Sequence, residues 1–124
     1  MMAKPTAHAP STNRMVFAHR GLNRLAPENT MPAFELAADA GATWMETDVD
    51  IISDGTAILI HDSTLDRTTN RTGSIYDLTA ADLPNIDAGS WFGPEYVGTR
   101  IPTLRDLVEF LVFCFEILFG LKKT

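Results

Sequence analysis

The sequence predicts an α/β fold that opens with a parallel βαβ unit, continues into a β-hairpin and contains a loop-rich insertion. Three observations predict it. Two short apolar runs, residues 15–19 and 43–52, flank an Ala-rich segment, and short connections join the three. Asp54-Gly55 follows the second run and is a strong hairpin signal. A turn-rich stretch over residues 63–100 comes next and is expected to be an insertion.

The βαβ unit has recognisable boundaries. The run "MVFAH" over residues 15–19 stops at Arg20-Gly21, as a buried strand ending in a turn does. Asn29 or Thr30 is suited to cap the helix that follows, and Gly41 is suited to end it. We therefore expect a helix of about ten residues between two parallel strands.

The hairpin predicts a cluster of acids with a histidine. A two-residue turn at Asp54-Gly55 places Asp48 directly opposite His61, and Glu46 and Asp50 fall on the same face. Carboxylates this close raise one another's pKa or need a cation between them, and a hard ion such as Mg²⁺ or Ca²⁺ suits them better than zinc. A solvated edge hairpin with alternating acids is the structural alternative.

A second histidine and an arginine end the first strand. Parallel strands of a βαβ unit end on the same side, so His19 is expected near the acids of the second strand. Histidine suits general acid–base chemistry, and Arg20 is suited to bind a phosphate group. Taken singly, each of these residue types is more often structural.

Composition restricts the partners. The chain has 124 residues, 45% of them hydrophobic, which suits one domain or part of one. The net charge of −6 and the lack of a long basic run argue against a nucleic-acid partner. Residues 1–14 are polar and without an apolar core, so we expect a disordered leader and a cytoplasmic location.

The later part of the chain carries two capping signals. Thr79 with Asp82 predicts a short helix over 79–83, and Thr103 with Asp106 predicts the start of a longer one. Within the insertion, the aromatic side chains are expected to pack a small core of their own rather than line a substrate pocket: Trp91, Phe92 and Tyr96. Residues 112–124 form an apolar tail. The segment 107–121 is too short and, with Glu109 and Glu116, too acidic to be a convincing membrane span.

Seven motifs occur in order: "AHRG" at 18–21, "PENT" at 27–30, "ETD" at 46–48, "DG" at 54–55, "HD" at 61–62, "LDRTTNRTG" from 65 and "DAGSW" from 87. The ordered set closely resembles the glycerophosphodiester phosphodiesterase family over roughly residues 15–111. The resemblance implies a partial (β/α)₈ TIM-type barrel. It also implies hydrolysis of small-molecule glycerophosphodiesters to an alcohol and sn-glycerol 3-phosphate, with a divalent cation, Mg²⁺ or Ca²⁺.

The resemblance also implies residue roles. The acid–base pair would be His19 and His61, and Arg20 would bind the substrate phosphate. Glu46 and Asp48 would bind the metal, and the family pattern does not require Asp50. Two further residues are expected to support the site by ordering its loop: Glu28 and Asn29.

The sequence departs from the family at its end. The family pattern includes a later Glu-x-Lys pair, whose Glu is a third metal ligand, and nothing here matches it, Glu116 included. We therefore expect a truncated phosphodiesterase over 15–111 that exposes strand edges and apolar helix faces, with 112–124 departing from the pattern. The alternative is a catalytically incompetent fragment that binds a ligand, or associates through its tail with a membrane or another chain.

Overall fold

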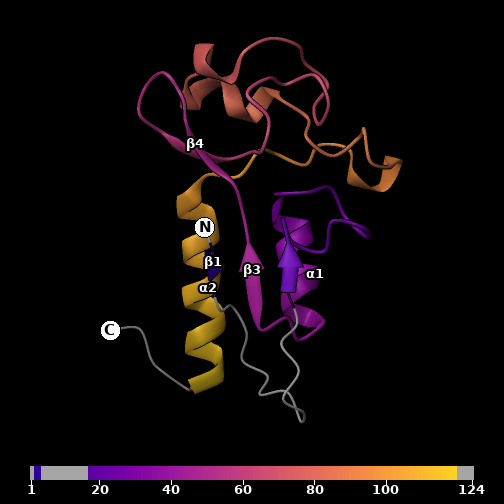
Figure 1. Ribbon diagram of the computed structural model, residues 1–124, viewed down its shortest axis with the longest axis vertical. Helices are drawn as coiled ribbons and strands as arrows, with labels where there is room; N and C mark the ends of the chain where they lie inside the picture. The colour runs from indigo at the N-terminus through magenta and orange to yellow at the C-terminus, as the bar shows by residue number, and fades with distance from the viewer. Residues whose placement is uncertain (1, 4–16, 120–124) are drawn as a thin grey trace.

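A computed structural model describes residues 2–3 and 17–119 (Figure 1). A three-stranded sheet and two helices occupy one end of the molecule, and a hairpin with a long irregular segment occupies the other. The strands are β1 (Met2–Ala3), β2 (Phe17–His19), β3 (Trp44–Glu46), β4 (Val49–Ile51) and β5 (Ala57–Leu59). The α-helices are α1 (Met31–Asp39) and α2 (Leu104–Phe119), and the 3₁₀ helices are η1 (Ile75–Asp77), η2 (Ala80–Asn85) and η3 (Pro94–Tyr96).

The predicted βαβ unit is confirmed. Strands β2 and β3 pair in parallel, with His19 beside Glu46, and α1 connects them. The strand order is β1-β3-β2, because β1 pairs antiparallel with β3 on its other side. Two residues of the expected disordered leader, Met2–Ala3, thus form a strand, and the rest of 1–14 lies outside the described residues.

Both α-helices begin where the sequence predicts. Thr30 precedes α1, although its side chain donates a hydrogen bond back to the Pro27 carbonyl (2.6 Å) and does not cap the helix. The start of α2 is fixed by a reciprocal pair: the N–H of Thr103 donates to the Asp106 carboxylate, and the N–H of Asp106 donates to the Thr103 hydroxyl. Helix α2 then continues to Phe119, beyond the predicted boundary at residue 111.

The expected single strand over 43–52 is two strands, and the predicted hairpin register is wrong by one residue. Val49 pairs with Leu59, and Asp48 accepts a main-chain hydrogen bond from Ile60, so His61 does not lie opposite Asp48. The turn contains three residues, 53–55, instead of two. Gly55 takes φ +87° and donates to the Ile52 carbonyl, which is the geometry of a type I turn closed by a left-handed residue.

The insertion over 63–100 is ordered although it contains only 3₁₀ helices. The short helix expected over 79–83 is the 3₁₀ helix η2, and Asp82 accepts from the N–H of Thr79 as the capping signal predicts. A buried cluster joins the insertion to the hairpin, and six of its ten members are isoleucines: Ile52, Ile58, Ile60, Leu65, Ile75, Leu78, Leu83, Ile86, Ala88 and Ile101. The length of the insertion is therefore compensated by a core of its own.

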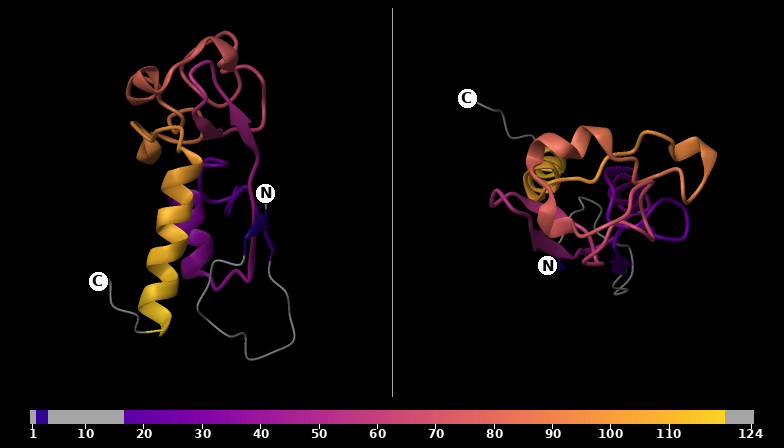
Figure 2. Two further views of the ribbon diagram at one scale, coloured as in Figure 1. Left: turned by 90° about the vertical axis from the view of Figure 1, so that its left-hand side faces the viewer. Right: turned by 90° about the horizontal axis from the view of Figure 1, so that it is seen from above.

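A second buried cluster lies between the sheet and the helices. Its members come from β2, α1, the segment leading into β3, β3, β5 and α2: Ala18, Phe34, Ala37, Ala42, Met45, Leu59 and Leu107. The insertion lies over the end of this layer toward which the arrows of β2 and β3 point (Figures 1 and 2). Several large apolar side chains remain exposed, among them Phe17, Ile51, Val108 and Phe113. Among the described residues, no helix combines the length and apolar character needed to cross a membrane.

Candidate active site

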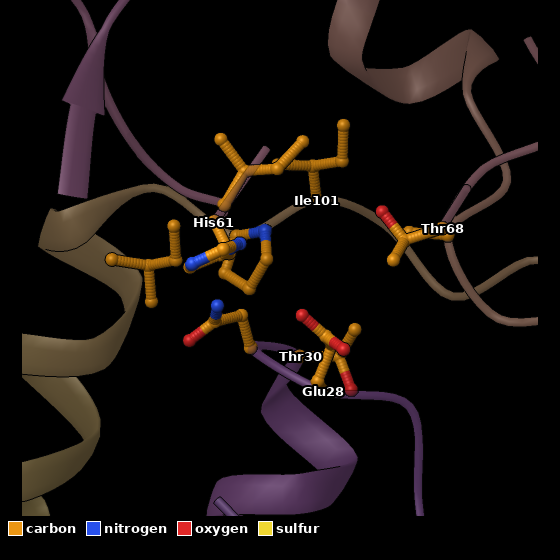
Figure 3. Close-up of a pocket in the computed structure, with 10 residues that line it drawn as sticks. Glu28, Thr30, His61, Thr68 and Ile101 are labelled. Carbon is orange, nitrogen blue, oxygen red and sulfur yellow. The ribbon is translucent and has the colours of Figure 1, made fainter. Parts of the chain in front are cut away.

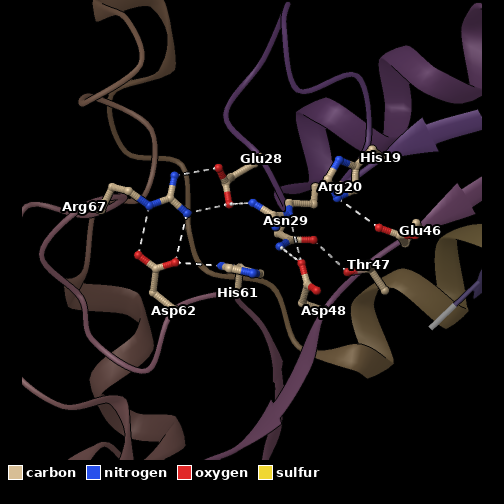
Figure 4. A network of polar contacts seen from close by, with 10 residues as sticks. All are labelled: His19, Arg20, Glu28, Asn29, Glu46, Thr47, Asp48, His61, Asp62 and Arg67. Atoms are coloured by element: carbon tan, nitrogen blue, oxygen red, sulfur yellow. Dashed lines mark hydrogen bonds and ion pairs between the residues drawn. The ribbon is translucent and has the colours of Figure 1, made fainter.

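The polar residues singled out from the sequence meet where β2 and β3 end, beneath the insertion (Figure 4). His19 and Glu46 are register partners on the two parallel strands, and Nε2 of His19 lies 2.9 Å from Oε1 of Glu46. Both side chains are about half exposed, so solvent reaches this pair. The expectation that His19 lies beside the acids of the second strand is confirmed.

Arg20 is held by two carboxylates. Its NH1 donates to Oε2 of Glu28 at 3.0 Å, and its Nε lies 3.0 Å from Oδ2 of Asp48 as an ion pair without the alignment of a hydrogen bond. The Arg20 backbone has φ +54°, a left-handed conformation that is uncommon for a residue with a long side chain. Such local strain persists where the surroundings fix it. Here the N–H of Arg20 donates to Glu46 and its carbonyl accepts from Asn29.

Asn29 joins the loop before α1 to the break between β3 and β4. Its Nδ2 donates to Oδ2 of Asp48 at 3.1 Å, and its Oδ1 accepts from the Thr47 hydroxyl at 2.9 Å. Asn29 and Thr47 are buried, and Asn29 also has a left-handed backbone (φ +57°), which asparagine tolerates better than most residues. These contacts keep Asp48 turned toward the loop and away from the ladder of the hairpin.

The second histidine belongs to a chain of charged groups that begins in the insertion. Nδ1 of His61 lies 2.8 Å from Oδ1 of Asp62. Arg67 donates from Nε and NH2 to the two oxygens of Asp62, and from NH1 and NH2 to the two oxygens of Glu28, at 2.9–3.0 Å. Glu28 therefore binds Arg67 and Arg20 together, and it links the His61 end of the network to the Asp48 end (Figure 4).

These contacts shift the acidities of the groups involved. Partial burial of Glu28 raises its pKa, but the hydrogen bonds and positive charges of Arg67 and Arg20 outweigh this and lower it. Hydrogen bonds from Arg67 and then His61 hold the pKa of Asp62 well below its usual range. The pKa of Arg67 is raised in turn by its bonds to Asp62 and Glu28. Both carboxylates are therefore ionised at neutral pH.

A small cavity lies between the loop before α1 and the start of the insertion (Figure 3). Its volume of about 10 Å³ holds roughly one water molecule. Its lining combines polar and apolar residues: Glu28, Asn29, Thr30, Leu59, Ile60, His61, Thr68, Ala88, Ile101 and Pro102. His61 and Glu28 thus face one space from two different parts of the chain.

Other residues singled out from the sequence lie elsewhere. Asp50 accepts from the Tyr76 hydroxyl at 2.7 Å and takes no part in the network. The aromatic residues of the insertion pack edge to face, Trp91 on Phe92 and Phe92 on Tyr96, and none of them lines the cavity. The Tyr96 hydroxyl donates to the Leu25 carbonyl, so this cluster ties the insertion to the loop after β2.

Sequence reasoning assigned no role to Asp62 and Arg67, although both lie within motifs that it singled out. The position of Asp62 beside His61 was a usable signal, because neighbouring carboxylates often orient a histidine. For the bonds between Arg67 and Glu28 there was no such signal, since Glu28 lies 39 positions away. Only folding brings Arg67 and Glu28 together.

The described residues do not complete a metal site. Glu46 and Asp48 offer hard oxygen ligands, but Glu46 already pairs with His19, and Asp48 with Arg20 and Asn29. Across residues 2–3 and 17–119, no group of three or more His, Cys, Asp or Glu side chains is placed to hold a metal ion. Because both carboxylates are engaged by other side chains and no third ligand of this kind lies with them among the described residues, we derive no chemical step through a metal.

Histidine, arginine and carboxylates at the ends of the strands of a parallel βαβ unit lie where α/β enzymes, TIM barrels among them, place their active sites. The sequence model of the glycerophosphoryl diester phosphodiesterase family matches residues 19–123. The chain belongs to this family. It spans between 35% and 40% of the length of three curated relatives that it matches, and corresponds to an N-terminal portion of them.

Three similar proteins illustrate the match. A glycerophosphodiester phosphodiesterase of Caldanaerobacter subterraneus is 44% identical over 97 residues, 78% of this chain and 40% of that protein. A crystal structure of the Agrobacterium tumefaciens enzyme superposes with TM-score 0.75 at 43% identity, covering 78% of this chain and 42% of the other. An Oleispira antarctica phosphodiesterase in complex with the product sn-glycerol-3-phosphate gives TM-score 0.78 at 41% identity, covering 88% and 43%.

Proposed function

We propose that this chain carries the acid–base half of a glycerophosphodiester phosphodiesterase site, which hydrolyses a glycerophosphodiester to an alcohol and sn-glycerol 3-phosphate. The observation that carries the proposal is the chain of hydrogen bonds and ion pairs that links Arg20 through Glu28, Arg67 and Asp62 to His61 (Figure 4). His19 ends the strand of the parallel βαβ unit directly before Arg20 and pairs with Glu46. The family membership and the likeness to a phosphodiesterase bound to sn-glycerol-3-phosphate support the substrate class.

In the proposed reaction, a glycerol hydroxyl attacks phosphorus while one histidine takes its proton, and the other histidine protonates the departing alcohol. Water then opens the cyclic phosphate, with the two roles exchanged. Arg20 stabilises negative charge on the phosphoryl oxygens. Because two carboxylates already neutralise Arg20, the substrate phosphate has to compete with Glu28 and Asp48 for its guanidinium.

A divalent cation enters the proposal through the family alone. Glu46 and Asp48 are the residues singled out here with suitable ligand chemistry, and water, the substrate phosphate or residues outside the described ones would have to supply further ligands. A bound cation would supply positive charge for the phosphoryl oxygens. We keep Mg²⁺ and Ca²⁺ as equal candidates.

The test is turnover by the 124-residue chain. Glycerophosphocholine and glycerophosphoethanolamine are supplied with Mg²⁺, with Ca²⁺ or with a chelator, and release of sn-glycerol 3-phosphate is measured. We expect cation-dependent release that falls by about 10²–10⁴-fold in His61→Ala, the usual contribution of a general acid or base. Glu46→Ala should lose activity as well. Asp50→Asn is the matched control, because Asp50 lies two positions from Asp48 and bonds to Tyr76 instead of the network.

The second candidate is a non-catalytic piece that binds a ligand or another chain. The incomplete ligand set and the exposed apolar side chains of α2 favour it. Background turnover in a chain that retains a dispersed NMR spectrum would select this candidate over the enzyme.

A further inference from the structure

Arg67 makes the most extensive set of charged contacts in the network. Its guanidinium forms one pair of hydrogen bonds with the Asp62 carboxylate and another with Glu28, and NH2 takes part in both. Such forked pairs fix orientation as well as distance, because the planar guanidinium and the planar carboxylates must align. The plane of Asp62 is thereby set by a residue five positions along the chain.

We propose that Arg67 is a positioning residue for His61: by holding Asp62, it keeps the imidazole proton on Nδ1 and leaves the Nε2 lone pair available for proton transfer. That the Nε2 lone pair serves in catalysis rests on the proposed function. The placement of the proton itself depends only on the contacts of His61, Asp62 and Arg67.

The chemistry of the carboxylate determines the tautomer. An ionised carboxylate can only accept hydrogen bonds, so the ring nitrogen that faces it must carry a proton. In neutral histidine the other nitrogen, Nε2, is then the acceptor. Oδ1 of Asp62 accepts from Nδ1 of His61 and from NH2 of Arg67, so the same oxygen serves the imidazole and the clamp.

Asp62 needs to be held by Arg67 because the pair that it forms with His61 is partly exposed. The side chain of His61 is 48% exposed and that of Asp62 is 24% exposed, so water competes for both groups. Without Arg67, Asp62 can turn toward solvent and release Nδ1. Glu28, whose side chain is only 11% exposed, anchors the far side of Arg67 and also binds Arg20. The orientation of His61 therefore depends on Glu28, which lies in the loop before α1.

The test is the protonation of the His61 ring, read from long-range ¹H–¹⁵N NMR spectra of the full chain at a pH where the ring is neutral. We expect the Nδ1–H form to dominate in the unmodified protein and the Nε2–H form to dominate in Arg67→Gln. Arg71→Gln is the matched control, since Arg71 is exposed, lies in the same loop and makes its described hydrogen bonds through main-chain atoms. The control should keep the Nδ1–H form.

Two results would overturn the proposal: an Nε2–H ring in the unmodified protein, or an Nδ1–H ring that persists in Arg67→Gln with its amide spectrum intact. If Arg67→Gln loses that spectrum, Arg67→Lys decides by the same criterion, because lysine keeps the charge but cannot form both forked pairs. The readout needs no turnover. An inactive chain with the expected tautomers defeats the proposed function alone, whereas an active chain whose tautomer ignores Arg67 defeats the positioning role alone.

Discussion

The sheet region, formed by β2, α1, β3 and α2, and the hairpin region, residues 49–101, reach order by different means. The sheet region has regular elements, and its core depends on small residues that let the elements approach closely, such as Ala18, Ala33 and Ala37. The hairpin region has little regular structure beyond two short strands, yet it contains the larger buried cluster. Regular secondary structure is therefore a poor guide to where this chain is well packed.

In the hairpin region, aspartate side chains accept hydrogen bonds from main-chain N–H groups that have no partner in a neighbouring strand. The Asp87 carboxylate accepts from the N–H groups of Gly89, Ser90 and Gly98, and the Asp54 carboxylate accepts from those of Thr56 and Ala80. These bonds satisfy backbone donors that a sheet would otherwise pair. The difference predicts that the hairpin region depends on ionised carboxylates and the sheet region on close packing.

Core truncations should have the largest effects. Phe34→Ala in the sheet region should cost about 3–5 kcal/mol and Ile75→Ala in the hairpin region about 2–5 kcal/mol, because both side chains are completely buried. Trp44 lies in β3 and Trp91 in the insertion, so variants that retain one tryptophan report each region by fluorescence during urea unfolding. Equal shifts of both signals in both variants would show one cooperative unit, and region-specific shifts would show two.

Acid should have the second-largest effect. As the pH falls, we expect the hairpin region to lose stability before the sheet region. Hydrogen bonds from the N–H groups of Gly89, Gly98 and Ser90 lower the pKa of Asp87 below its ordinary value of 3.8. The stabilisation is therefore fully present above pH 3.8 and is lost as the pH falls through the lowered value. We expect the Trp91 signal to change before the Trp44 signal during acid titration.

Asp87→Ala should destabilise the hairpin region at neutral pH by about 0.5–1.5 kcal/mol, because water can replace the lost acceptor at the exposed N–H groups of Ser90 and Gly98. Asp77→Ala is the control, because Asp77 is an exposed acid of the same insertion. If the Trp44 and Trp91 fluorescence signals change at the same pH, the hairpin region does not depend on ionised carboxylates more than the sheet region does.

The contact between the regions should give the smallest effect. Tyr96→Phe removes the hydrogen bond to the Leu25 carbonyl and should cost about 0.5–1.5 kcal/mol. Tyr76→Phe is a matched control, since it removes a hydrogen bond to Asp50 within the hairpin region. Hydrogen exchange at residues 22–26 should accelerate in Tyr96→Phe only, and unchanged exchange there would argue against a tie between the regions.

The sequence predicted the sheet region better than the hairpin region, for physical reasons. The strand, helix and strand from Phe17 to Glu46 carry local signals that agree with one another. The hairpin register was missed because Asp54-Gly55 suits both a two-residue turn and a three-residue loop, and the two differ by one residue in pairing. In the site, the pairing of His19 with Glu46 follows from the parallel strands. The contact of Arg67 with Glu28 spans 39 positions and produces no pattern in the sequence.

Strand β5 and the residue that follows it place alternate side chains in different cores: Leu59 packs in the sheet region, and Ile58 and Ile60 pack in the hairpin region. A one-residue insertion or deletion between β4 and β5 would exchange these directions and place each side chain in the wrong core. We therefore expect a change of chain length at residues 53–55 to be destabilising, although that turn is exposed. The insertion carries no such alternation, so we expect length changes in its exposed loops to leave both cores in register.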